Sequence, residues 1–158
     1  MHSFLKLHDI CIKKGISIAV AESCTSGRIA SSITAISGAS SFFKGGILAY
    51  NNDVKVNILG VSKLVIKQKT EVSSEVVEEM AKNARKIISV DFAVSTSGYA
   101  GPSGGNSLNP IGTVYIGISS LAKTTSKRFY FKGDRESVIN QTVIASVDFL
   151  LQELKNIT

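Results

Sequence analysis

The sequence is poor in the residues that build crosslinks and membrane spans. Only two cysteines, Cys11 and Cys24, occur in 158 residues, too few for the disulfide framework that staples small secreted domains. No apolar run approaches the roughly 20 residues that a membrane-spanning helix needs, and the first residues turn polar too early for a secretory leader. These absences predict a reduced, cytoplasmic protein without membrane association.

Metal-ligating residues are also sparse. The two histidines, His2 and His8, both stand near the beginning of the chain, and no cluster of histidine, cysteine and carboxylate residues has the spacing of a metal site. The Walker A and dinucleotide-binding glycine patterns are missing as well. We therefore expect neither a metal nor a cofactor.

A dense basic block is missing, although the net charge is +6. The lysines and arginines are scattered, without interleaved aromatic residues, which indicates solvated surface charge rather than a nucleic-acid groove. The charge favours anionic partners in general and makes a nucleic-acid partner the weaker alternative.

The periodicity of apolar residues predicts alternating helices and strands. Helices are expected over about 4–14, 26–36, 53–59, 74–88 and 134–154, and strands over 17–21, 42–50, 91–97, 111–119 and 124–132. The segment 61–74 is interpreted as a connector with at most a helical turn near Ser62. Without repeats or linkers, this order predicts one domain over residues 1–158, an α/β protein built as a three-layer α/β/α sandwich with a mixed sheet.

Residues 20–27, VAESCTSG, pass from an apolar strand to a helix start. In an open α/β sheet the carboxyl ends of the strands face the ligand crevice, and a helix N-terminus offers unpaired N–H groups. Ser23 is therefore a candidate nucleophile, with amides near Thr25 to Gly27 as oxyanion donors. The alternative is that Ser23, Thr25 and Ser26 only cap the helix. Cys24 has no histidine near it to form a thiolate, so we expect it to be buried by packing.

A second candidate lies in residues 50–55, YNNDVK, where a predicted strand meets a short helix that Asp53 is expected to cap. Burial and the positive end of the helix would both lower the pKa of Lys55 and favour its neutral amine, which can accept a proton. At an ordinary pKa near 10.4 only about 1 lysine in 2,500 is neutral at pH 7. The alternative is a solvated surface lysine.

Glycines gather in residues 97–105, SGYAGPSGG, after a predicted strand. Closely spaced glycines let backbone N–H groups converge on an anion, although the spacing of Gly98, Gly101 and Gly104 also fits an ordinary turn. Arg135 is expected in the first turn of the last helix, with Asp134 as its cap. There the guanidinium and the helix dipole can hold a phosphate or carboxylate together.

Together these motifs resemble the CinA C-terminal domain family. The matching stretches are AESCTxG at 21–27, YxNxxK at 50–55, SGxAGPxGG at 97–105, PIGTV at 110–114 and GDR at 133–135, in one order over nearly the whole chain. The family is associated with nicotinamide-mononucleotide amidohydrolase activity, which releases ammonia and yields nicotinic acid mononucleotide in pyridine-nucleotide recycling. The resemblance implies Ser23 as nucleophile, Lys55 as general base and Tyr50 as an auxiliary catalytic residue.

The resemblance also implies a pyridine mononucleotide as the small-molecule partner, and we expect a homo-oligomer. Oxyanion and substrate contacts are expected at Thr25, Ser26, Gly27, Ser97, Gly98, Gly101, Gly104 and Arg135. Family members are often fused to an N-terminal molybdopterin-binding-like domain, which these residues do not resemble.

The chain departs from the family pattern at two positions. Ser26 stands where the first glycine of a Thr-Gly-Gly turn is usual, and Tyr99 replaces a small aliphatic residue. Ser26 is expected to narrow the backbone approach to Ser23. The alternative hypothesis is therefore a catalytically inactive nucleotide-binding or regulatory module of the same fold.

Overall fold

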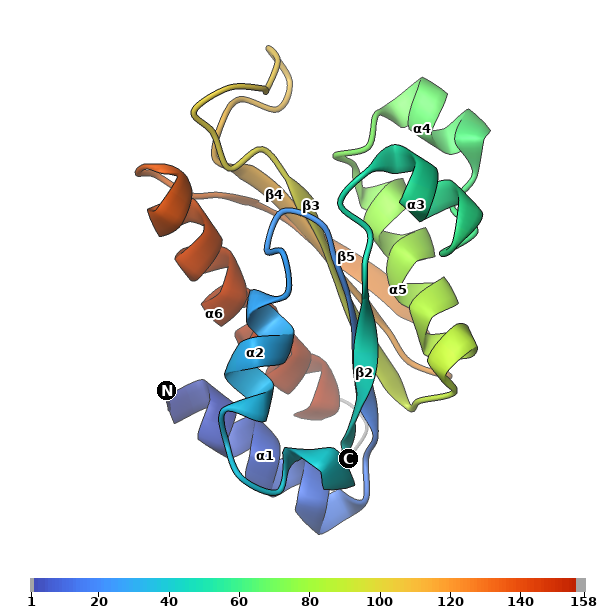
Figure 1. Ribbon diagram of the computed structural model, residues 1–158, viewed down its shortest axis with the longest axis vertical. Coiled ribbons are helices and arrows are strands. Elements are labelled where there is room, and N and C mark those ends of the chain that lie inside the picture. Colours follow the sequence, from blue (N-terminus) through green and yellow to red (C-terminus); the bar gives the residue numbers. More distant parts are fainter. Residues whose placement is uncertain (1, 156–158) are drawn as a thin grey trace.

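The computed structural model describes residues 2–155, in which one mixed sheet lies between two layers of helices (Figure 1). The helices are α1 (His2–Lys14), α2 (Arg28–Thr34), α3 (Asn52–Asn57), α4 (Lys63–Lys69), α5 (Ser74–Ile88) and α6 (Arg135–Lys155), with a 3-10 turn η1 (Ala39–Ser41). The strands are β1 (Ile18–Glu22), β2 (Phe43–Leu48), β3 (Phe92–Gly98), β4 (Thr113–Ser119) and β5 (Thr124–Tyr130). Residues 1 and 156–158 of the predicted domain lie outside the described residues.

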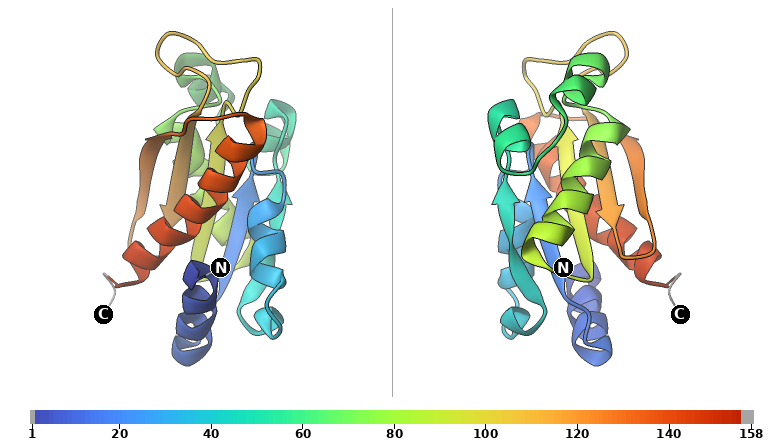
Figure 2. Two further views of the ribbon diagram at one scale, coloured as in Figure 1. Left: turned by 90° about the vertical axis from the view of Figure 1, so that its left-hand side faces the viewer. Right: turned by 90° about the vertical axis from the view of Figure 1, so that its right-hand side faces the viewer.

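The sheet has the strand order β2-β1-β3-β4-β5. Strand β1 runs parallel to β2 and β3, whereas β4 is antiparallel to both β3 and β5. Helices α1, α2 and α6 cover one face, and α3, α4 and α5 lie on the other (Figures 1 and 2). The three-layer α/β/α sandwich and its terminal hairpin are confirmed. Because β1, β2 and β3 are parallel, their carboxyl ends meet at one edge of the sheet.

Side-chain size differs between the two faces of the sheet. Val20 and Val94 belong to the larger core, which includes residues of α1, α2 and α6, whereas their neighbours Ala21 and Ala93 belong to the smaller core with α5. Gly117 of β4 lets α5 approach closely, because a Cβ there would lie 2.5 Å from the carbonyl oxygen of Val77. The missing side chain at Gly117 therefore allows α5 to pack directly against β4.

Two predicted features near this edge need correction. The predicted connector over 61–74 contains helix α4, whose cap is Ser62; its packing on the α5 side, through Val65 and Ile66, is a tertiary effect that local periodicity does not reveal. Helix α3 is capped by Asn51 rather than Asp53, since the Asn51 side chain accepts a hydrogen bond from the Asp53 amide at 2.7 Å.

Helix α2 begins later than predicted. Ser26 and Gly27 both have positive φ, 51° and 89°, so the helix starts only at Arg28. A left-handed residue cannot continue a right-handed helix, which explains the two lost positions. None of the helices formed by residues 2–155 is long and apolar enough to cross a membrane.

Candidate active site

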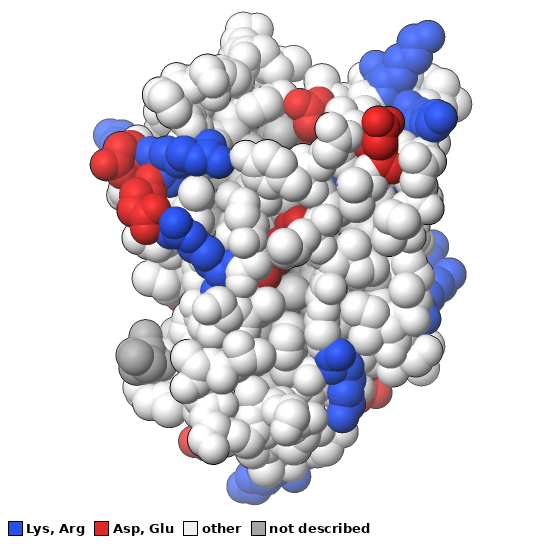
Figure 3. All heavy atoms as spheres, viewed as in Figure 1, with Lys and Arg blue, Asp and Glu red and all other residues white. Residues whose placement is uncertain are grey.

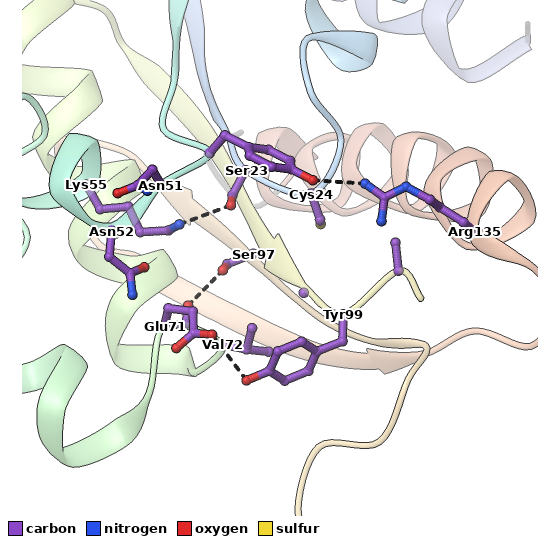
Figure 4. Close-up of a pocket in the computed structure, with 13 residues that line it drawn as sticks. Ser23, Cys24, Asn51, Asn52, Lys55, Glu71, Val72, Ser97, Tyr99 and Arg135 are labelled. Atoms are coloured by element: carbon purple, nitrogen blue, oxygen red, sulfur yellow. Dashed lines mark hydrogen bonds between the residues drawn. The ribbon is translucent and has the colours of Figure 1, made fainter. Parts of the chain in front are cut away.

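A cavity of about 340 Å³ opens at the carboxyl ends of β1, β2 and β3 (Figure 4). A volume of this size is typical of small-ligand sites. The lining residues come from segments far apart in the sequence: Ser23, Cys24, Tyr50, Asn51, Asn52, Lys55, Glu71, Val72, Ser97, Gly98, Tyr99, Ala100 and Arg135. Six of the predicted site residues are among them: Ser23, Tyr50, Lys55, Ser97, Gly98 and Arg135.

Ser23 follows β1 directly, and its amide donates to the carbonyl of Thr96 in β3 at 3.1 Å. This bond fixes the backbone of the candidate nucleophile to the central strand. Lys55 reaches the same point from α3, where its Nζ donates to Ser23 Oγ at 3.1 Å. The two side chains are 7% and 1% exposed, so the pair lies at the buried floor of the pocket.

Burial is the main influence on the Lys55 amine. Desolvation lowers the pKa of Lys55 from its ordinary range, and the negative charge of Glu71 and the thiol of Cys24 oppose this change. The solvated-surface alternative for Lys55 is wrong, because this side chain is almost fully buried. A lysine so placed is closer to the neutral form that a general base needs.

The N-terminus of α2 is capped by a side chain of the protein itself. Glu22, 0% exposed, accepts hydrogen bonds from the amides of Gly27 at 2.9 Å, Ile29 at 3.2 Å and Ala30 at 2.9 Å. The Ser26 amide donates to the Ser23 carbonyl at 3.1 Å. The expectation that the Ser26 and Gly27 amides face a ligand is therefore corrected: the Ser23 carbonyl already accepts from the first, and the Glu22 carboxylate at the positive end of the helix accepts from the second.

The three predicted contact residues of this turn lie outside the pocket lining. Thr25 is fully buried, and its hydroxyl pairs with that of Thr96 at 2.8 Å. Gly27 is the left-handed cap of α2, and Ser26 precedes it in the same conformation. Substrate contact at these positions stays a prediction.

Arg135 and Tyr50 both line the pocket and contact each other. Arg135 Nη2 donates to the Tyr50 hydroxyl at 3.0 Å, and its Nη1 donates to the Gly101 carbonyl at 2.8 Å. Tyr50 is 60% exposed, so it stands at the rim rather than beside the buried pair. Asp134 caps α6 as predicted, accepting from the Ser137 amide at 2.9 Å.

The glycine-rich segment contributes unequally to the site. Gly98 lines the pocket, and a Cβ there would lie 2.7 Å from the Thr113 carbonyl oxygen. Gly101 contributes its carbonyl to Arg135, whereas Gly104 packs behind the Tyr99 ring, where a Cβ would lie 3.2 Å from Cδ1. Substrate contact by Gly101 and Gly104 stays a prediction.

Several lining residues were missed by the sequence reasoning. Asn51 could have been found as a helix cap, because asparagine is favoured there. Glu71 gave no signal, since it lies in the segment interpreted as a connector. Cys24 is buried, as predicted, and burial raises the pKa of its thiol to about 12, which disfavours the thiolate.

Charged side chains are sparse on the face of the molecule shown in Figure 3. Lysines and arginines stand apart around its periphery, interspersed with acidic residues, and the described residues form no continuous basic stripe on this face. Within residues 2–155 there is also no group of three or more histidine, cysteine and carboxylate side chains placed to hold a metal ion.

The fold and site define an α/β sandwich with a serine and a buried lysine paired at the crest of the sheet. The chain belongs to the CinA C-terminal domain family, whose model matches residues 3–154. A nicotinamide-nucleotide amidohydrolase from Pseudomonas putida is 44% identical over 135 residues, which cover 85% of this chain and 84% of that protein.

Other relatives share the domain within longer chains. A CinA-like protein from Fervidobacterium nodosum is 41% identical over 91% of this chain, but the match spans only 35% of that protein's length. Among solved structures, competence or damage-inducible proteins from Enterobacter asburiae and Klebsiella pneumoniae superpose with TM-scores of 0.93 and 0.94 at 32% and 30% identity. Each alignment covers 96% or more of both chains.

Proposed function

We propose that this chain is an amidohydrolase that converts nicotinamide mononucleotide to nicotinic acid mononucleotide and ammonia through a serine and a lysine. The observation that carries the proposal is the 3.1 Å contact between Lys55 Nζ and Ser23 Oγ in a buried setting. The name of the Pseudomonas putida relative, which is similar over most of both chains, supports the choice of substrate.

The first half of the reaction forms an ester on the enzyme. Neutral Lys55 accepts the proton of the Ser23 hydroxyl while Ser23 Oγ attacks the carboxamide carbon. The resulting oxyanion needs backbone donors. Because the Ser26 and Gly27 amides are already engaged, this role falls to the amide of Cys24, which lines the pocket. Collapse of the intermediate breaks the C–N bond, and the protonated Lys55 gives its proton to the departing ammonia.

The second half consumes water. Lys55, neutral again, accepts a proton from a water molecule that attacks the ester carbon, and this proton then passes to Ser23 Oγ as the C–O bond to the serine breaks. The nicotinic acid group formed loses its proton to solvent and leaves as the carboxylate. Tyr50 lies at the rim of the pocket, bonded to Arg135, so its proposed auxiliary part is confined to relaying protons through water and shaping the entrance.

The nucleotide part of the substrate supplies orientation. Arg135 carries a guanidinium at the start of α6, on the pocket wall, which suits a phosphate. Ser97 and Gly98 line the same cavity. Free nicotinamide lacks the phosphate and forgoes the binding energy that holds the reacting carbon in place, so we expect it to be a poor substrate.

The test is ammonia release from nicotinamide mononucleotide by the purified protein and its variants. Ser23→Ala and Lys55→Ala should each lose about a thousandfold or more in kcat, as removal of a nucleophile or its base does in other serine hydrolases. Ser31→Ala and Lys44→Ala, at exposed positions away from the pocket, serve as matched controls and should keep full activity.

An unaffected Lys55→Ala enzyme would remove Lys55 from the mechanism. Tight binding of the nucleotide without ammonia release would instead support the catalytically inactive binding module, and Ser26→Gly would then show whether the departure at the turn is the cause.

A further inference from the structure

The pocket has two chemically different ends. Arg135 stands at one end, and Glu71 lies at the other, on the same side as Lys55 (Figure 4). Glu71 is the one acidic side chain among the described residues that line this cavity. The proposed catalytic steps use Ser23, Lys55 and the phosphate contact of Arg135, so they leave Glu71 without a role.

Glu71 is held in place by its backbone. The Ser97 hydroxyl donates to the Glu71 carbonyl at 2.7 Å, which ties this residue to the end of β3. The preceding residue, Thr70, has φ 66° and ψ 166°, a conformation that a β-branched residue adopts only when its surroundings impose it. Residues in such sparsely populated conformations cluster at functional sites.

Tyr99, the residue directly after β3, contacts the Glu71 carboxylate. Its hydroxyl donates to Glu71 Oε1 at 3.4 Å, a long hydrogen bond that occupies one of the two carboxylate oxygens. Burial and the charge of Glu71 raise the pKa of Tyr99, which keeps its hydroxyl a donor. Gly104 packs against the Tyr99 ring and limits its movement. The pair therefore forms a wall that is both aromatic and negatively charged.

This wall borders the space that the ring of a nicotinamide substrate has to occupy. Attack requires the carboxamide carbon to lie about 3–3.5 Å from Ser23 Oγ, and that carbon is bonded directly to the ring. With the phosphate drawn toward Arg135, the ring occupies the space beside Ser23 and Lys55, in front of Glu71 and Tyr99. The ring of a pyridine nucleotide is a pyridinium and carries a positive charge.

We propose that Glu71, supported by Tyr99, is a specificity-determining residue that selects a cationic aromatic ring over a neutral ring of the same shape. The carboxylate attracts the pyridinium through charge, and the Tyr99 ring adds a cation–π contact. The inference rests on the proposed function, and it deepens it by naming what the pocket distinguishes. A zwitterionic ligand, anionic at Arg135 and cationic at Glu71, matches both ends of the cavity.

The experiment compares two substrates that differ only in ring charge: nicotinamide mononucleotide and the 5′-phosphate of benzamide riboside, whose neutral ring carries the same carboxamide. The measured quantity is the ratio of their kcat/KM values for ammonia release, on the plateau of the pH profile. Taking this ratio cancels changes in Lys55 basicity and in protein concentration, because both substrates meet the same enzyme.

Glu71→Gln keeps the shape of the side chain and removes its charge, and we expect it to lower the selectivity ratio about tenfold, mainly through the charged substrate. Tyr99→Leu should lower the ratio about threefold, whereas Tyr99→Phe retains the ring and should stay within about twofold of wild type. Asp53→Asn is the matched control, since it removes one exposed acidic charge from α3 without touching the pocket lining.

Equal losses on both substrates in Glu71→Gln would overturn the inference, because a carboxylate that binds a ribose hydroxyl or only supports the fold does not sense ring charge. An unchanged ratio would overturn it too, while leaving the amidohydrolase proposal intact. If the wild-type protein hydrolyses neither compound, the proposed function fails. In that case, the ratio of the dissociation constants of the two compounds, measured by calorimetry, tests the role of Glu71 independently of catalysis.

Discussion

The N-termini of α2 and α6 both lie near Ser23 or the pocket, and they are used in opposite ways. The first amides of α2 are bonded to the buried carboxylate of Glu22, so this positive end is neutralised inside the protein. The start of α6 is capped only by the short side chain of Asp134, and its first residue, Arg135, lines the cavity. Of these two helix N-termini, the one nearer to Ser23 is therefore already occupied by a side chain of the protein.

The two helix N-termini therefore differ in what they do: the start of α2 stabilises a turn, and the start of α6 places an arginine in the cavity. Glu22 immediately precedes Ser23, so the same three hydrogen bonds that satisfy α2 also fix the turn that presents the hydroxyl. Arg135 instead bonds to a carbonyl and to an exposed tyrosine hydroxyl, partners that leave its positive charge uncompensated. Under the proposed function, the start of α6 binds the anionic part of the ligand and the start of α2 holds Ser23 in place, and the predictions below test that division.

The largest expected effect is on folding. Glu22→Ala leaves three amides at the start of α2 without their buried acceptor, and should lower the free energy of unfolding by about 3 kcal/mol or more. Asp134→Ala removes the cap of α6 and should cost about 1 kcal/mol. Urea denaturation of both variants measures the difference. Equal losses would mean that the two helix ends are equivalent after all.

The next effect is on substrate binding. Arg135→Ala should raise KM for nicotinamide mononucleotide by about 30- to 100-fold, the range of a charge-assisted hydrogen-bonded pair. Hydrolysis of nicotinamide riboside, which has no phosphate, should hardly change. Arg28→Ala removes an arginine of α2 that pairs with Glu136 of α6, and it controls for a general loss of positive charge. A riboside reaction that falls as far as that of the nucleotide would contradict the phosphate assignment.

A smaller effect concerns pH. Lys55 must be neutral to act as a base, so the rate should fall as the pH drops through its pKa, which burial lowers from 10.5. The charge of Glu71 favours the ammonium form and raises this pKa. Glu71→Gln should therefore move the acidic limb of the kcat profile to lower pH, and Asp53→Asn should not. A shift toward higher pH would show that Glu71 does not act on Lys55 through charge.

Sequence reasoning brought Ser23 and Lys55 to one site, where they are in contact, but described the surroundings of the pair less well. Ser23 and Lys55 stand at junctions between a strand and a helix, and such junctions of parallel strands meet at one edge. The fold class followed from the same alternation. The burial of Lys55 did not follow from its local sequence, because residues from later in the chain, such as Glu71 and Val72, line the same pocket.

The residues that escaped prediction are those placed by tertiary contacts. Glu71 lies in a segment without periodicity, and it reaches the pocket because Ser97 binds its carbonyl. Glu22 was part of the quoted motif, but its function as the internal cap of α2 depends on the left-handed backbone at Ser26 and Gly27. Local sequence patterns predicted where the chain turns. Tertiary packing determines which polar groups already have a partner within the protein and which can bind a ligand.

The smallest expected effect lies at that turn. Ser26 has a φ of 51°, which costs an L-residue roughly 1–2 kcal/mol, whereas glycine adopts this conformation freely but loses more entropy on folding. Ser26→Gly should therefore raise the free energy of unfolding by up to about 1 kcal/mol. Ser31→Gly, at an exposed position inside α2, should lower it by about as much. If both glycines destabilise the protein, the turn is not strained, and the rigidity ascribed to the α2 end depends on Glu22 alone.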